Sequence, residues 1–97
     1  RRGSIGTMPW PSTPGPFVQV WDLWHAGQRD AAESVFEQTI APLLRISVRS
    51  LGGGHIVHKL ALQRQGIIDT AYVRGPCEEL DPITLKEIDE ACDRIGL

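Results

Sequence analysis

The chain has 97 residues, of which 41% are hydrophobic and 23% charged, and its formal net charge is −2. A chain of this length builds one domain at most. The near-neutral charge argues against nucleic acid or an anionic membrane as the main partner, because both attract clustered Lys and Arg. Its two cysteines are too few for a disulfide framework, which favours reduced thiols and a cytoplasmic location.

The first segment, Gly3-Ser4-Ile5-Gly6-Thr7-Met8, has the pattern of a short buried strand. A lone strand is not stable, because its N–H and C=O groups must pair with neighbouring strands. No later segment of the chain has the pattern of such a neighbour. We therefore expect the 97 residues of the chain to be the C-terminal piece of a larger α/β protein.

Residues 8–16 contain four of the seven prolines and predict a loop. Pro16 suits the first turn of a helix that runs to about residue 26. That helix is apolar over most of its circumference, which predicts that it is well covered. Its apolar members are Phe17, Val18, Val20, Trp21, Leu23 and Trp24. We expect Gly27 to end it in the left-handed conformation.

A second helix is expected from about Asp30 towards Ser47. One apolar stripe with i, i+3, i+4 spacing supports it, formed by Ala32, Val35, Phe36, Ile40, Leu43 and Leu44. Pro42 has no amide N–H to donate to the Gln38 carbonyl, and a proline inside a helix costs ~3 kcal/mol unless the helix kinks there. We predict that the helix bends at Pro42 and does not end there.

The glycine-rich residues 50–54 indicate a flexible turn. A short third helix is predicted to follow it and to end at Gly66. Its predicted inward positions are Ile56, Val57, Leu60 and Ala61. The next stretch, 67–80, is expected to be irregular and held by Ile67, Ile68, Tyr72 and Val73. It ends at Gly75-Pro76 and an acidic run.

The last helix begins either at Asp81-Pro82, as N-cap and first helical residue, or at Thr84, where Thr84 and Glu87 form a capping box. Its buried stripe is predicted to be Leu85, Ile88, Cys92 and Ile95. The sequence alone does not choose between the two starts.

Two patterns resemble ligand sites. Gly52-Gly53-Gly54 precedes a helix and could cradle a phosphate, but it lacks the Gly-Lys-Ser/Thr ending of a P-loop, so a plain turn is favoured. Four residues are candidate zinc ligands: His55, His58, Cys77 and Cys92. Their spacing contains no Cys-x-x-Cys knuckle, and we expect no metal.

Catalytic side chains are equally sparse. Ser12 and Ser50 lie in predicted loops without the Gly-x-Ser-x-Gly elbow of a nucleophile. Arg74 lies on a stiff segment, where a paired carboxylate is the favoured partner and a substrate contact the minority option. Lys59 and Lys86 have polar surroundings, whereas a Schiff-base lysine needs a desolvated pocket.

The order of motifs nevertheless resembles a known family. The N-terminal motifs are Gly3-Ser4-Ile5-Gly6-Thr7-Met8-Pro9, the helix end Ala26-Gly27-Gln28, and Ala31-Ala32 followed by Pro42-Leu43-Leu44. The C-terminal motifs are His58-Lys59-Leu60-Ala61-Leu62, Gly66-Ile67-Ile68, Val73-Arg74-Gly75-Pro76 and Leu80-Asp81. In this order and spacing the chain resembles the C-terminal third of the dihydrodipicolinate synthase / N-acetylneuraminate lyase family.

The resemblance implies an α/β fold, a (β/α)8 TIM barrel with a C-terminal helical extension. Residues 1–28 would be the end of the barrel, with Ile5 on the eighth strand, then a loop and the eighth helix at 16–26. Residues 29–97 would be the helical extension, so that the piece itself is mostly α.

The resemblance also implies a function: a Schiff-base lyase (aldolase, synthase or dehydratase) acting on pyruvate or a 2-keto-3-deoxy sugar acid. The family's catalytic lysine, tyrosine and carboxylate-binding motif have no counterpart here, so no catalytic residue, cofactor or metal is expected in this segment. Ile5 and Gly6 would bind substrate, and residues 7–10 would face its variable end. Family members are commonly homotetramers, which implies a homo-oligomer in the cytoplasm.

Two alternatives stay open. One is a non-catalytic helical interaction or oligomerisation module, in which residues 1–15 form a disordered arm. The other is a small zinc-binding domain, which requires the four candidate ligands to converge on one ion.

Overall fold

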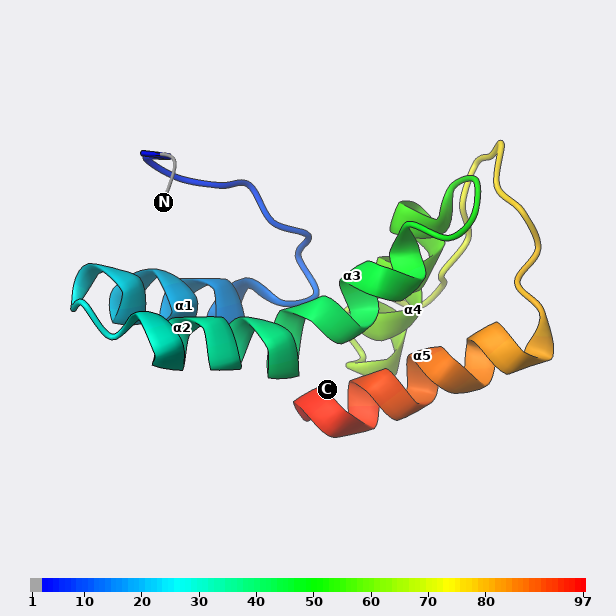
Figure 1. Ribbon diagram of the computed structural model, residues 1–97. Helices are drawn as coiled ribbons and strands as arrows, with labels where there is room; N and C mark the ends of the chain where they lie inside the picture. The colour runs from blue at the N-terminus through cyan, green and yellow to red at the C-terminus, as the bar shows by residue number, and fades with distance from the viewer. Residues whose placement is uncertain (1–2) are drawn as a thin grey trace.

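The computed structural model describes residues 3–97, and Arg1 and Arg2 of the predicted barrel end lie outside the described residues. Five α-helices and one π-helical turn follow one another in this part of the chain (Figure 1). They are α1 (Pro14–His25), α2 (Arg29–Val35), η1 (Phe36–Ile40), α3 (Ala41–Ser47), α4 (Gly53–Arg64) and α5 (Pro82–Ile95). The prediction of a mostly α piece is confirmed.

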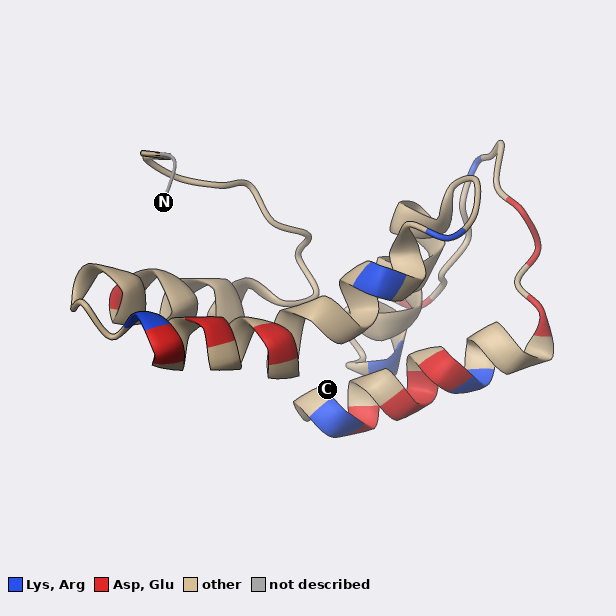
Figure 2. Ribbon diagram, viewed as in Figure 1, with Lys and Arg blue, Asp and Glu red and all other residues tan. Residues whose placement is uncertain are grey.

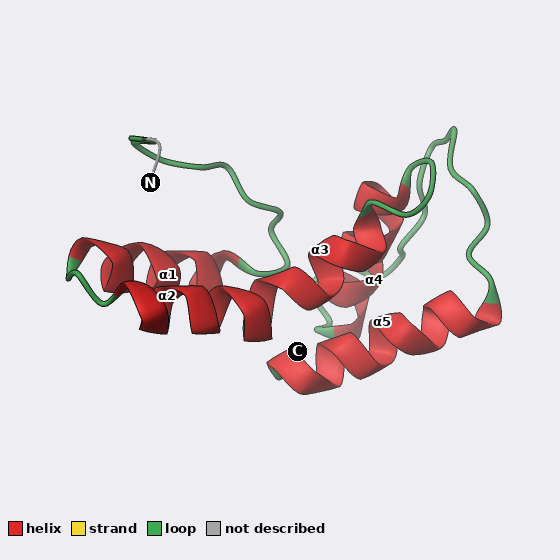
Figure 3. Ribbon diagram, viewed as in Figure 1, coloured by secondary structure: helices red, strands yellow, loops and turns green. Residues whose placement is uncertain are grey.

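The predicted strand at residues 3–8 is not formed, and residues 3–97 contain no strand (Figure 3). The segment 3–10 is a loop that passes over α1 (Figure 1). Ile5 and Met8 are 97% and 96% exposed. The physical reason is that no neighbouring strand exists among residues 3–97 to pair with this backbone.

Helices α1 and α2 form an antiparallel hairpin (Figure 1). Gly27 ends α1 with φ +78°, as predicted, and the Gln28 amide donates to the Leu23 carbonyl at 2.9 Å. This left-handed ending lets the chain reverse direction within three residues. The predicted boundary between residues 28 and 29 falls in this turn. The expectation that α1 is well covered is wrong for the described residues, because α1 has no buried residue.

Helices α2 and α3 are joined without a break through η1, and α3 leaves the direction of α2 at an angle (Figure 1). The Ala41 amide donates to the Phe36 carbonyl five residues back, which is the π-helical pattern. Pro42, which has no amide to donate, follows directly in the first turn of α3. The predicted bend is confirmed, and the π turn η1 lies at the bend, directly before Pro42.

The core lies between α3, α4 and α5, at the opposite end from the α1–α2 hairpin. Its buried members are Leu43, Ile46, Val57, Ala61, Ile88, Ala91 and Cys92. Ile56, Leu60 and Ile95 pack around them, so the predicted inward faces of α4 and α5 are largely confirmed. Leu85 departs from the prediction, because it is 41% exposed.

Asp81 is the N-cap of α5, which decides between the two predicted starts. Its carboxylate accepts hydrogen bonds from the amides of Ile83 and Thr84 at 2.8 and 2.9 Å. These bonds lower the pKa of Asp81. The loop before it is irregular as predicted, but Ile67 and Tyr72 are exposed and do not hold it.

Candidate functional site

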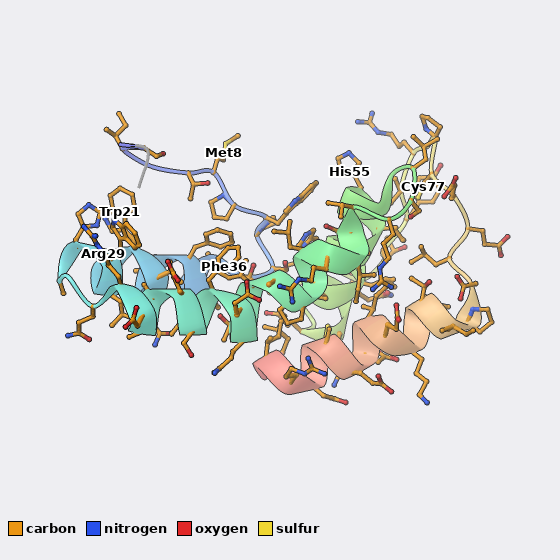
Figure 4. The ribbon with its side chains drawn as sticks, in the orientation of Figure 1. Met8, Trp21, Arg29, Phe36, His55 and Cys77 are labelled. Carbon is orange, nitrogen blue, oxygen red and sulfur yellow. The ribbon has the colours of Figure 1, made fainter. Side chains whose placement is uncertain are left out.

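An open cavity lies between the N-terminal loop and α1. It has a volume of about 550 Å³ and is open to solvent. The loop side consists of Gly3, Ser4, Gly6 and Thr7, and the helix side of Phe17, Val20, Trp21, Trp24 and His25, with Phe36 from η1. Figure 4 labels Trp21 and Phe36 on the helical side and Met8 on the loop above. We call this space the aromatic pocket.

The helical wall of the aromatic pocket follows from the spacing of its residues. Phe17, Val20, Trp21 and Trp24 recur at i, i+3, i+4 and i+7, so they lie on one face of α1. Two contacts fix the far end of this face. The His25 ring lies 4.2 Å from the Trp21 ring, and the Arg29 guanidinium lies 5.1 Å from the centre of the Trp24 ring.

The aromatic pocket can bind an apolar or planar group, but it contains little acid–base chemistry. His25 is its single ionisable side chain among the described residues. No Asp, Glu, Lys or Arg occurs from residue 3 to residue 21, so this side of the molecule is almost without charge (Figure 2). Besides His25, the polar side chains that line the pocket are the hydroxyls of Ser4 and Thr7.

Of the two predicted substrate-binding residues, Gly6 lines the aromatic pocket and Ile5 does not. Both line a smaller adjoining hollow of about 310 Å³ with Pro9, Pro14 and Val18. Ile5 is almost fully exposed there. Within this chain the two residues therefore lie at the rim of an open apolar surface.

A second site, which sequence reasoning missed, joins the N-terminal loop to α4. His58 is 4% exposed, and its Nδ1 lies 2.7 Å from the Ser12 Oγ. The Trp10 ring stacks on the imidazole, with ring centres 4.8 Å apart and planes 11° apart. Burial lowers the pKa of His58 to about 4. We call Trp10, Ser12 and His58 the histidine anchor.

One signal in the sequence could have revealed the anchor. His58 directly follows Val57 and lies three residues before Ala61, both of which were predicted to face inward, so its side chain starts beside the core face of α4. A buried histidine needs polar or aromatic partners. The Trp and Ser of the proline-rich loop supply them, but nothing in the sequence places that loop against α4.

The zinc hypothesis fails on geometry. No group of three or more His, Cys, Asp or Glu side chains within residues 3–97 is arranged to hold a metal ion. His58 belongs to the histidine anchor, and Cys92 is fully buried in the core, where burial raises the pKa of its thiol. His55 and Cys77 are labelled in Figure 4 on α4 and on the loop before α5.

Gly52 precedes α4, Gly53 and Gly54 are the first two residues of that helix, and all three are closely packed. Gly52 has φ +75°, and a Cβ there would lie 2.9 Å from the Cys77 Cα. A Cβ on Gly53 would lie 2.6 Å from the Ser47 carbonyl oxygen. These glycines permit close approach of three chain segments.

The remaining candidates are Lys59, Lys86 and Arg74, and both lysines contact other groups of the protein. Lys59 Nζ donates to the Tyr72 carbonyl at 2.6 Å, and Lys86 lies 3.7 Å from Glu90. Neither lysine lines the aromatic pocket. The predicted carboxylate partner of Arg74 is not found, since Arg74 forms no ion pair with a carboxylate of residues 3–97. Arg64 instead pairs with Asp89 and Asp93 of α5.

Comparison with known proteins gives no relative: no protein-family description, no curated protein and no solved structure matches the chain. Among the described residues, every helix is too short or too polar to cross a membrane.

Proposed function

We propose that this chain is the C-terminal part of a Schiff-base lyase resembling the dihydrodipicolinate synthase / N-acetylneuraminate lyase family, acting on pyruvate or a 2-keto-3-deoxy sugar acid. The chain would supply part of the barrel wall and of the substrate pocket, while the reacting lysine belongs to another part of the protein. The observation that carries the proposal is the bare surface of α1.

Helix α1 has apolar side chains on opposite faces. One face lines the aromatic pocket, and the other bears Val18 and Leu23 on a shallow hollow of about 430 Å³. Val18 is 59% exposed and Trp21 is 39% exposed. A helix that is apolar over most of its circumference is normally covered by other elements. Among the described residues, α2 and η1 are the helices that pack against α1, and Val18 and Leu23 lie outside that contact beside Gln19 and Asp22. In a barrel, the strands would cover the face of α1 that lines the aromatic pocket.

The N-terminal loop supports the same proposal. Residues 3–9 form no backbone–backbone hydrogen bond, apart from any that involves residues outside the described range. The one hydrogen bond within the segment is from Ser4 Oγ to the Gly6 carbonyl, at 2.9 Å. An apolar segment with a free backbone can join a sheet, because its donors and acceptors are available for pairing. In the proposed protein Ile5 and Gly6 would then line the substrate pocket.

The proposed chemistry starts with attack of a lysine amine on the 2-oxo carbon of the substrate, with loss of water and formation of an imine. Lys59 and Lys86 lie away from the aromatic pocket, so neither is proposed as that lysine. The proposal includes assembly of several copies and a cytoplasmic location, and it involves no nucleic acid or membrane.

Borohydride trapping tests the proposal on the complete polypeptide that carries this segment in its source organism. The polypeptide is incubated with pyruvate and with a 2-keto-3-deoxy sugar acid, reduced with sodium borohydride, and digested for mass spectrometry. Hydride reduces the imine to a stable secondary amine. We expect a substrate-dependent adduct on a lysine outside these residues. No adduct, or an adduct on Lys59 or Lys86 alone, contradicts the proposal.

One observation favours the alternative of a non-catalytic helical interaction module. Helices α3, α4 and α5 enclose a core from their own side chains. An interaction module needs such self-sufficiency, and a barrel fragment does not. The coding sequence before Arg1 separates the two: a lysine-bearing strand roughly forty to fifty codons before Gly3 (the family spacing) supports the lyase, and a start codon directly before Arg1 supports the module.

A further inference from the structure

The histidine anchor is the main contact between the N-terminal loop and the helices at the other end of the molecule. Besides the stacked ring of Trp10 and the Ser12 bond, Gln65 Nε2 lies 3.4 Å from the Ser12 carbonyl. Trp10 also packs closely on α4, since a Cβ on Gly54 would lie 3.0 Å from its Cζ2. Ser12 and Thr13 are 2% and 3% exposed. The anchor therefore holds the loop just before α1 begins.

The buried imidazole has one unsatisfied atom. Its Nδ1 faces the Ser12 Oγ, but its Nε2 is buried without a hydrogen-bond partner among the described residues. A neutral imidazole can leave one nitrogen unpaired at modest cost, whereas an imidazolium carries a proton on both nitrogens and a full charge. A charged donor without water or a partner is far more costly to bury.

We propose that the histidine anchor is a pH-sensitive latch. With a neutral imidazole it holds residues 10–13 against α4, and protonation of the imidazole releases them together with the loop that forms one wall of the aromatic pocket. The latch does not depend on the lyase function.

The ionisable groups near His58 lie on α4 and on the helices that pack against it. Residues 3–13 contain no ionisable side chain. On α4 itself, the ionisable neighbours are His55, whose ring meets Trp10 edge-on at 5.2 Å, with Lys59 and Arg64. On the helices packed against α4, the charged groups are Arg45 and Arg49 on α3, and Lys86, Glu87, Asp89, Glu90, Asp93 and Arg94 on α5. Burial is the cause of the lowered pKa of His58.

The direction of the pH effect follows from the pKa values. Burial lowers the pKa of His58 from 6.5 to about 4, and the released imidazole returns to the ordinary value. The docked state is therefore fully favoured above pH 6.5 and loses stability as the pH falls towards 4. Linkage of these two values gives a docking constant about 30-fold smaller at pH 5 than above pH 7.

Amide hydrogen exchange of the full chain tests the latch. The Thr13 amide donates to the Trp10 carbonyl at 3.4 Å and reports on the docked turn. We expect its protection factor, corrected for the intrinsic exchange rate at each pH, to fall about 30-fold between pH 7.5 and pH 5. Amides in the core of α5, such as that of Cys92, should keep their protection, because release is local.

The decisive variant is His58→Phe, which keeps an aromatic ring under Trp10 and removes the titrating group. Its Thr13 protection should not depend on pH in this range. His55→Phe is the matched control, because His55 is exposed and also contacts Trp10, and it should keep the 30-fold fall. Should His58→Phe not fold, NMR titration of the His58 ring in the unmodified chain decides instead, with a pKa near 4 expected.

Three results would overturn the latch: a pH-dependent fall that persists in His58→Phe, a His58 pKa near 6.5, or loss of Cys92 protection in parallel with that of Thr13. The borohydride experiment detects a lysine adduct, whereas the exchange experiment measures the protection of the Thr13 amide. Failure of one proposal is therefore distinguishable from failure of the other.

Discussion

At the scale of single residues, the glycines before α4 show how packing limits substitution. Gly53 lies in the first turn of α4, where a Cβ would meet the Ser47 carbonyl oxygen at 2.6 Å and the Ser50 Oγ at 2.9 Å. Backbone oxygen cannot swing aside as a flexible side chain can. Gly15, in the first turn of α1, has no atom within 4 Å of its ideal Cβ position.

Substitution of these two glycines by alanine should change the free energy of unfolding differently. Gly53→Ala should lower the free energy of unfolding by about 1–3 kcal/mol, because the added methyl group forces the backbone apart. Gly15→Ala, the matched control, should leave it unchanged or raise it by up to ~1 kcal/mol, because alanine restricts the unfolded chain. Urea denaturation followed by circular dichroism measures both. Equal effects of the two changes would show that the close approach at Gly53 is absent.

At the scale of helical elements, the π turn η1 sets which residues of α3 reach the core. It adds a residue to the helical repeat just before Pro42, so that α3 starts with a new register. In that register Leu43 is 1% exposed and contacts α4 and α5, while the next residue, Leu44, is 37% exposed. The sequence stripe assigned both leucines to the same apolar face.

The neighbouring leucines therefore differ in their expected contribution to stability. Leu43→Ala should reduce the free energy of unfolding by about 2–5 kcal/mol, because it removes a buried side chain and leaves a cavity. Leu44→Ala should reduce it by about 0.5 kcal/mol or less, as is usual for surface positions. Thermal melts of the two variants compare the same chemical change at adjacent positions, and losses of similar size would contradict the observed register.

At the scale of the whole molecule, the chain is elongated, with extents of 41 × 24 × 23 Å. Its self-contained core is at one end, and the almost uncharged loop and α1 are at the other (Figure 2). This asymmetry predicts that the two ends differ in stability, because buried apolar contacts protect a region from local opening.

The proposed lyase predicts a specific change at the weaker end. In the isolated chain the amides of residues 3–9 should exchange at rates close to those of an unstructured peptide. In the complete polypeptide the same amides should be protected at least tenfold, because a strand in a sheet exchanges only after opening. Hydrogen exchange measured by mass spectrometry compares the two. Fast exchange in both forms would favour the interaction module with a free arm.

Much of the local structure was predictable from the sequence, because it depends on short-range chemistry. Gly27 and Gly66 end α1 and α4 with positive φ, and Asp81, at one of the two starts that the sequence offered, caps α5, since each provides what a helix terminus needs from its own residues. The bend at Pro42 follows from a missing amide. The candidate site was less predictable: Gly6 lines the aromatic pocket, but the partners of His58 were not foreseen.

The sequence by itself determined that the chain is mostly helical, that Gly27 and Gly66 end two of the helices, and that the chain bends at Pro42, because capping, proline chemistry and apolar periodicity act over a few residues. Only the tertiary structure decided that residues 3–8 are a loop, that Leu44 is outside the core, and that His58 lies beneath Trp10. Each of these depends on contact between segments far apart in the chain. The free energy of such a contact depends on which neighbours are present, and a local pattern does not contain that information.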